Sequence, residues 1–225
     1  METPASAPLE PPLAPFEARV LGCLIEKAFA TPEYYPLTLN SLVAACNQKS
    51  NRDPVLNVGA SEVDATLESL RQRRLASVFA GADARVPKHK HTLDQIFPLE
   101  PAAVALLAEL LLRGPQTTAA LRGNAERLVA MPDLAEIETL LTDLAARSSG
   151  GLVQKLPRQP GQKEARWAQR LTGDAPQPTA SEQSTPLTVA LTLPPEVERR
   201  LAALEAEVVH LRAELTKLRS ALGEG

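Results

Sequence analysis

One polar loop carries the side chains in this chain that are best suited to hold an anion or a partner. Residues 47–54 read Asn-Gln-Lys-Ser-Asn-Arg-Asp-Pro and offer several hydrogen-bond donors beside two cations. The side chains could bind a phosphate, a peptide or the other half of the chain. Alternatively, Asn and Asp could hydrogen-bond the local backbone and hold a long turn. The candidate contact residues are Asn47, Gln48, Lys49, Asn51 and Arg52.

Two expected β-hairpins carry the other concentrations of basic residues. Their returning strands are predicted over residues 85–93 and 164–171. Cations on such hairpins could contact nucleic acid phosphates without reading sequence, or they could be solvated surface charges. The candidate contacts are Arg85, Lys88, Lys90, Lys163, Arg166 and Arg170.

The sequence offers little equipment for catalysis. His89 and His91 could bind a metal from one strand, but two neighbouring lysines and the lack of a nearby carboxylate or thiolate argue against it. The chain has no phosphate-cradling glycine loop, no nucleophile elbow and no metal-binding Cys/His spacing. We therefore expect no catalytic residue, no metal and no cofactor, and a protein that is not an enzyme.

The elements that must position these residues occur twice in the same order. Helices are predicted over residues 15–30, 38–47 and 61–74, with strands over 75–80 and 85–93. The same series is predicted again over residues 101–113, 117–129, from 133, 152–156 and 164–171. The apolar positions Val63, Leu67 and Leu70 match Ile137, Leu141 and Leu144. We expect Ser61 with Asp64, and Asp133 with Glu136, to cap the two third helices.

Three helices followed by a hairpin are typical of a winged-helix domain. We predict a mainly α protein with small β-hairpin wings, made of two tandem winged-helix domains over residues 15–98 and 99–173. A winged-helix domain usually places its third helix in the DNA major groove. Here those helices carry acidic residues, which phosphates repel: Glu62, Asp64 and Glu68 in the first, and Asp133, Glu136, Glu138 and Asp143 in the second.

The remaining segments have a different character. Residues 1–14 are rich in proline and are expected to be disordered, and residues 174–195 are expected to be a flexible linker. Residues 196–222 predict a coiled-coil helix, because apolar residues alternate at spacings of four and three. The seam consists of Val197, Leu201, Leu204, Val208, Leu211, Leu215, Leu218 and Leu222.

The charges beside this seam favour a parallel homodimer. In a parallel pair Arg200 would face Glu205, and Glu207 would face Arg212, so both pairs attract. The alternative is an amphipathic helix that folds back on its own chain.

Composition limits the partners. The 225 residues include 24 Lys and Arg against 27 Asp and Glu, a net charge of −3, so bulk charge alone would not hold nucleic acid. Cys23 and Cys46 are expected to be small apolar residues of a reduced interior. No signal segment and no membrane-spanning run is found, and the cytoplasm is the expected location.

Several motifs resemble one known family. The run ACNQKSNRDPV at residues 45–55, with EARVLGCLIEK and TPEYYPLTLNSL before it, is similar to the YceH-like family of uncharacterised bacterial proteins. The match covers about residues 16–173 and leaves the C-terminal tail outside. The resemblance implies two tandem winged-helix domains and no established activity.

Two interpretations of function remain open. The first is a DNA-associated or transcription-regulatory factor that contacts nucleic acid of unknown sequence through its basic hairpins. The second is a dimeric protein-interaction scaffold without DNA binding, whose acidic third helices dock onto a protein partner.

Overall fold

The computed structural model describes residues 8–79, 86–159, 161–174 and 207. The described residues from 8 to 174 belong to one compact unit. The predicted coiled coil, apart from residue 207, and the predicted linker, apart from residue 174, lie outside the described residues.

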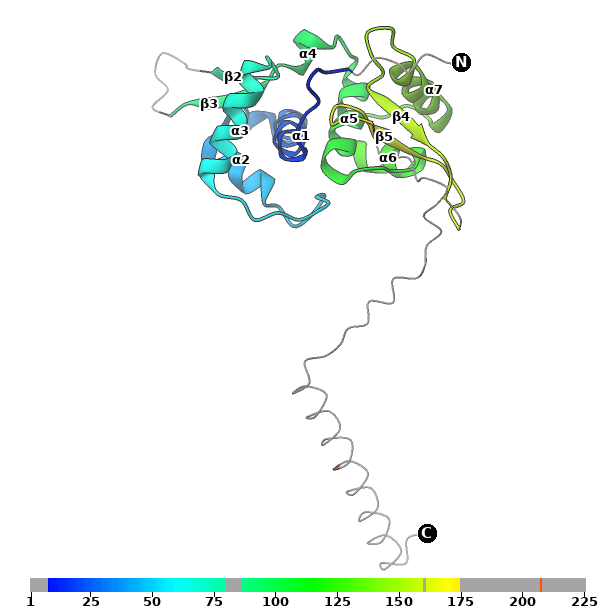
Figure 1. Ribbon diagram of the computed structural model, residues 1–225, viewed down its shortest axis with the longest axis horizontal. Helices are drawn as coiled ribbons and strands as arrows, with labels where there is room; N and C mark the ends of the chain where they lie inside the picture. The colour runs from blue at the N-terminus through cyan, green and yellow to red at the C-terminus, as the bar shows by residue number, and fades with distance from the viewer. Residues whose placement is uncertain (1–7, 80–85, 160, 175–206, 208–225) are drawn as a thin grey trace, which may run out of the picture. The chain divides into compact units, whose positions relative to one another are not determined.

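The first repeat of the first unit has three helices and a three-stranded sheet (Figure 1). Its elements are α1 (Pro15–Ala30), the 3-10 helix η1 (Pro32–Tyr34), β1 (Leu37–Thr38), α2 (Leu39–Cys46), α3 (Ala60–Gln72), β2 (Ala76–Phe79) and β3 (Lys88–His91). The sheet order is β1-β3-β2, and both pairings are antiparallel. The two-residue strand β1 was not predicted.

The second repeat follows a short connecting helix, α4 (Leu93–Ile96), which was also not predicted. Its elements are α5 (Pro101–Arg113), α6 (Thr118–Ala125), α7 (Leu134–Ala145), β4 (Val153–Leu156) and β5 (Arg166–Gln169). The two strands pair antiparallel. An isolated β-bridge between Gln116 and Trp167 corresponds to the pairing of β1 with β3 in the first repeat.

Helix caps show how closely the repeats correspond. Thr38 caps α2 by accepting a hydrogen bond from the Ser41 N–H, and Thr117 caps α6 in the same way. The predicted cap of α7 is confirmed, since the Asp133 side chain accepts from two N–H groups of the first turn. The predicted cap of α3 by Ser61 is wrong. That helix begins one residue earlier, after Gly59, whose N–H donates to the Glu62 carboxylate.

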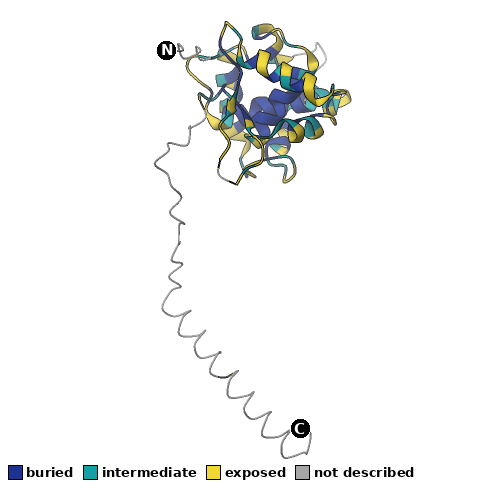
Figure 2. Ribbon diagram, turned by 90° about the vertical axis from the view of Figure 1, so that its right-hand side faces the viewer, coloured by how far each residue is buried: buried dark blue, intermediate teal, exposed yellow. Residues whose placement is uncertain are grey.

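Helices α1 and α5 pack against each other and join the repeats. Gly22 of α1 allows this close approach, because a Cβ atom at that position would lie 3.0 Å from the Leu112 side chain. The apolar residues of both repeats form one continuous core, drawn dark blue in Figure 2. The boundary between residues 98 and 99 thus separates two repeats in sequence that share one interior.

The N-terminal segment differs from its expectation. Disorder was predicted for residues 1–14, but residues 8–14 lie against the folded unit. Leu13 is buried and its N–H donates to the Leu171 carbonyl at 2.7 Å, while Arg73 donates to the carbonyls of Pro11 and Pro12. The segment therefore contacts both repeats, and residues 1–7 lie outside the described part.

Within the described residues, none of the helices has the length and apolar character to span a bilayer.

Candidate functional site

The side chain of Arg52 is buried inside the chain. Its guanidinium forms two hydrogen bonds with the carboxylate of Glu26 in α1, at 2.5 and 3.1 Å, and both side chains are at most 1% exposed. It also donates to the Ala45 carbonyl and to the Gln48 side chain. Arg52 is therefore engaged within the fold and offers no open face to a nucleic acid.

Asn51 and Arg127 extend this ion pair into the second repeat. Arg127, which follows α6, binds Glu26 at 2.6 Å and Glu109 of α5 at 2.7 Å. The Asn51 amide donates toward the same two carboxylates and accepts from Arg113 at 3.0 Å. Asn51 has a φ of 55°, a left-handed conformation that Asn tolerates better than most residues. Asn51, in the second half of this loop, thus binds the second repeat, which is one of the alternatives predicted for the loop.

The first half of the loop binds the local backbone. The Asn47 side chain both accepts from the Val58 N–H at 2.8 Å and donates to the Val58 carbonyl at 2.9 Å, which closes the segment before α3. Gln48 accepts from Arg52 and Lys27. Lys49 is exposed. Of the five candidates in this loop, Lys49 alone has an open, charged side chain.

Burial and charge act differently on the two carboxylates of the network. Burial alone would raise the pKa of Glu26, but hydrogen bonds and charge from Arg52, and then from Arg127, outweigh it and lower this pKa to about 2. Burial raises the pKa of Glu109, because Arg127 and Asn51 offset only part of the lost hydration. One oxygen of Glu109, Oε2, is buried without a hydrogen-bond partner. The network is therefore a structural link between the repeats.

The first hairpin, formed by β2 and β3, presents Lys88 and Lys90 on one face of β3. Both lysines are half-buried, and His89 and His91 lie on the opposite face because side chains alternate along a strand. Burial lowers the pKa of both histidines, which favours their neutral form. Arg85 lies outside the described residues.

The second hairpin, formed by β4, β5 and their connection, is more cationic. Lys163 and Arg166 are exposed, and so are Lys155 and Arg158 on the facing strand and its extension. Lys155 forms an ion pair with Glu138 of α7 and lies 5.3 Å from the centre of the Trp167 ring. Arg170 is instead buried, with its Nε atom 2.6 Å from Asp174.

A polar pocket lies where this hairpin meets α6 and α7. It has a volume of about 400 Å³ and is lined by Lys155, Arg158 and Lys163 together with Glu138, Glu164, Thr118 and Ala165. Burial would raise the pKa of Glu138, but hydrogen bonds from Lys155 and Thr118 outweigh it and lower this pKa. This pocket brings the three cations Lys155, Arg158 and Lys163 close to the carboxylates of Glu138 and Glu164.

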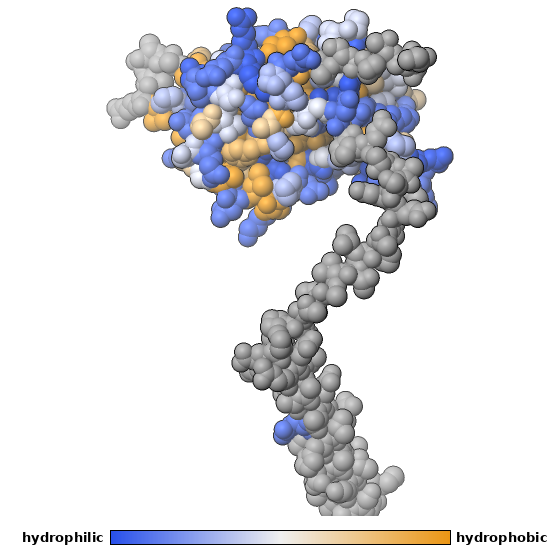
Figure 3. Space-filling model, viewed as in Figure 1, coloured by the Kyte–Doolittle hydropathy of each residue, from blue (hydrophilic) through white to orange (hydrophobic). Residues whose placement is uncertain are grey.

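The third helices expose acids, as the sequence indicated. Glu62, Asp64 and Glu68 of α3 are exposed, as are Glu136 and Asp143 of α7. Glu62 and Glu136 accept hydrogen bonds at the N-termini of their helices, which gives them a structural role. Figure 3 shows the hydrophilic surface of one face interrupted by hydrophobic residues near its middle.

Sequence reasoning missed Glu26, Glu109 and Arg127. A usable signal was present for the first two, because each lies within an otherwise apolar stretch of helix: LIEK in α1 and LLAELLLR in α5. A carboxylate there must be paired once the helix is buried. Arg127 lies in a segment without such a pattern and could not be assigned this way.

The chain is similar to one described family and to several proteins of known sequence. A family described as "Protein of unknown function, DUF480" matches residues 13–162. A UPF0502 protein of Geobacter sulfurreducens is 51% identical over 195 residues, 87% of this chain and 88% of the relative. One from Geotalea uraniireducens is 49% identical over 216 residues, 96% and 97% of the two chains. One from Burkholderia pseudomallei is 45% identical over 213 residues, 92% and 85% of the two chains.

The described residues form a mainly helical fold with small antiparallel sheets. The chain belongs to the DUF480 (UPF0502) family, with which its predicted YceH-like resemblance is consistent. The family match ends at residue 162, so the C-terminal tail lies outside it, as predicted. The alignment with the Geotalea uraniireducens relative covers 96% of the chain and extends into the tail.

Proposed function

We propose that this protein consists of two winged-helix domains packed back to back, and that it binds nucleic acid phosphates through its second hairpin, with the first hairpin assisting. It would act in the cytoplasm by binding, not by catalysis. The observation that carries the proposal is the set of exposed cations Lys155, Arg158, Lys163 and Arg166 on both sides of one hairpin.

The element order supports the winged-helix assignment. Each repeat has three helices followed by an antiparallel hairpin, and in each a short segment before the second helix pairs with the returning strand: β1 with β3, and Gln116 with Trp167. Two independent copies of this pairing favour one duplicated domain over a chance arrangement.

The distribution of charge supports contact through hairpins and not through third helices. The exposed acids of α3 and α7 would meet phosphates if either helix entered a groove. The hairpins avoid this repulsion. A contact made this way would neutralise phosphates and would be tolerant of sequence.

A second candidate function is a protein-interaction scaffold. Leu134, at the start of α7, is 50% exposed beside the acidic residues Asp133 and Glu136. A half-exposed leucine with an acidic surround suits a basic, partly apolar protein surface. In this alternative the second hairpin has no nucleic acid partner.

We also propose that the C-terminal heptads pair two copies of the chain in parallel, which would present two sets of hairpins to one partner. This rests on the sequence pattern from Val197 to Leu222.

The two functions are separated by a direct binding measurement on the full chain. Fluorescence anisotropy with a labelled DNA duplex at low salt is expected to show binding that Lys163→Gln with Arg166→Gln weakens by about tenfold or more. Arg71→Gln is the matched control, because Arg71 is an exposed arginine on α3 of the first repeat and is not part of the second hairpin. Equal losses in the two variants would contradict a hairpin interface, and an absence of binding at low salt would favour the scaffold.

A further inference from the structure

Arg19 is a buried cation without an ion pair. It lies in α1, is only 3% exposed, and has no carboxylate in salt-bridge contact among the described residues. Its Nη2 atom donates to the Pro54 carbonyl at 2.7 Å and its Nη1 atom to the Cys46 carbonyl at 3.5 Å. The Nε atom is buried and has no partner. Buried charges are ordinarily paired, so this arrangement needs an explanation.

Arg52 differs from Arg19 because it has an ion pair. Arg52 is buried to a similar degree and holds Glu26 in two hydrogen bonds. Burial lowers the pKa of Arg19, because its guanidinium loses water without gaining a contacting carboxylate. Arg52 shows the opposite shift, since its ion pair with Glu26 outweighs burial and raises its pKa.

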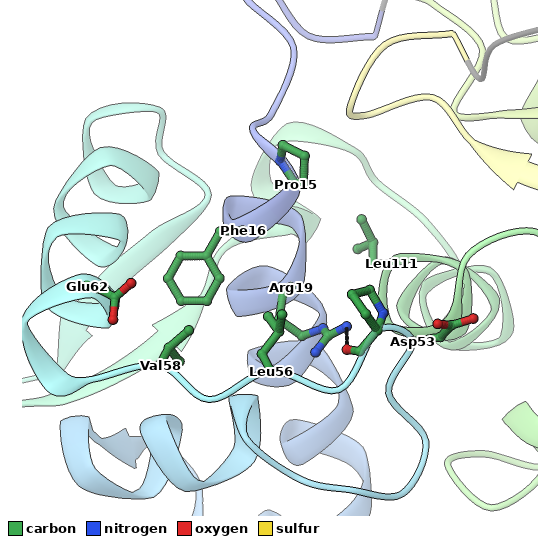
Figure 4. A pocket seen from close by; sticks show the side chains of 9 residues that line it. Pro15, Phe16, Arg19, Asp53, Leu56, Val58, Glu62 and Leu111 are labelled. Carbon is green, nitrogen blue, oxygen red and sulfur yellow. Dashed lines mark hydrogen bonds between the residues drawn. The ribbon is translucent and has the colours of Figure 1, made fainter. Parts of the chain in front are cut away.

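Arg19 lines a pocket of about 380 Å³ (Figure 4). The pocket is bounded by α1, the segment before α3, and α5, and its walls include the apolar side chains of Phe16, Leu56, Val58 and Leu111. Figure 4 shows the guanidinium between Leu56 and Leu111, with its hydrogen bond to the Pro54 carbonyl. The volume is at the lower end of the ~300–1,000 Å³ range of ligand pockets.

Two carboxylates also line the pocket and restrict the charge of an occupant. Asp53 and Glu62 are both exposed. They would repel a dianion such as phosphate more strongly than a monoanion. An anion with an apolar body could instead meet Arg19 with its charged end and bury its apolar end against the walls.

We propose that this pocket binds a small monocarboxylate with a short apolar body, and that Arg19 is its recognition residue. The walls come from α1 and the segment before α3 in the first repeat and from α5 in the second. A bound ligand would therefore contact both repeats. This site is separate from the hairpins, and the proposal does not depend on nucleic acid binding.

The test uses the full chain, three probes of matched chemistry, and inorganic phosphate as a dianion. Octanoate has the apolar body and the carboxylate, octanol has only the body, and acetate has only the charge. Isothermal titration calorimetry is expected to show octanoate binding about 10-fold to 100-fold more tightly than octanol, the range for a hydrogen bond to a charged group. Acetate and inorganic phosphate are expected not to bind.

Two variants assign the effect to this pocket. Arg19→Gln removes the charge and is expected to abolish the preference for octanoate over octanol. Leu56→Trp fills the pocket with an aromatic ring at a half-buried position and is expected to block both ligands while the chain stays folded, as thermal melting would show. Arg71→Gln, an exposed arginine elsewhere, is the control and should bind octanoate normally.

Each contrary outcome would overturn the proposal. Equal binding of octanoate and octanol would remove the role of Arg19, and so would unchanged octanoate binding by Arg19→Gln. Octanoate binding that survives Leu56→Trp would place it elsewhere, and no binding up to about 10 mM would exclude this ligand class.

Discussion

The ion pair between Glu26 and Arg52 makes a quantitative prediction about stability. Replacing Glu26 by Gln leaves two arginines, Arg52 and Arg127, close together without this carboxylate. The pKa of Glu26 is lowered from 4.5 to about 2, which corresponds to about 3 kcal/mol of stabilisation by its charge. Loss of one partner from a buried pair commonly costs ~3–5 kcal/mol. We expect Glu26→Gln to lower the free energy of unfolding by about 3 kcal/mol at pH 7.

The effect should depend on pH with a defined sign. A carboxyl group with a lowered pKa in the folded state stabilises above its unfolded pKa, here 4.5, and this stabilisation is lost as pH falls toward about 2. The difference between wild type and Glu26→Gln should therefore shrink to roughly 1 kcal/mol at pH 3. The charge of Glu26 contributes to the raised pKa of Glu109, so Glu26→Gln is expected to lower the Glu109 pKa as well.

Urea unfolding followed by circular dichroism, at pH 7 and pH 3, measures both quantities. Glu68→Gln is the control, since Glu68 forms an exposed pair with Arg71 that should contribute less than about 1 kcal/mol. A loss below about 1 kcal/mol for Glu26→Gln at pH 7, or a loss of the same size at both pH values, would refute a buried charge network as the link between the repeats.

Three further predictions concern the core, a cap and the tail. Gly22→Leu should lower the free energy of unfolding by about 1–3 kcal/mol, because the new side chain would meet Leu112 at the α1–α5 contact. Urea unfolding measures this loss, and an unchanged stability would show that the two helices can separate freely. Asp133→Ala should cost about 1 kcal/mol through the lost cap of α7, and an unchanged midpoint would contradict that cap. In sedimentation velocity the full chain should be dimeric and a chain ending at Gly173 monomeric, whereas a dimeric shortened chain would exclude the heptads as the assembly device.

The sequence predicted the helices and hairpins because their periodicity is strong. Val63, Leu67 and Leu70 are all buried along one face of α3, as their spacing required. The strand β1 has only two residues, too few for any periodic pattern. The wrong cap at Ser61 could have been avoided, because aligning Val63 with Ile137 also aligns Gly59 with Asp133 and Glu62 with Glu136.

The candidate site was harder to predict, since its contacts join distant parts of the chain. The composition of residues 47–54 points to a candidate site, but the partners of this loop in α1 and α5 depend on how the repeats pack. Hairpin cations were visible in the sequence, while burial of Arg170 was not, because its partner Asp174 lies beyond the predicted strand. The unpaired state of Arg19 follows only from three-dimensional packing.

The most direct test of the hairpin interface is the salt dependence of duplex DNA binding. The logarithm of the binding constant should fall linearly with the logarithm of salt concentration, with a slope of about −0.9 per phosphate contacted. Replacing both Lys163 and Arg166 by Gln should make this slope shallower by as much as about 2, while Arg71→Gln leaves it unchanged. A slope that is the same in the wild type and both variants, or that becomes shallower only when Arg71 is replaced, would contradict the account.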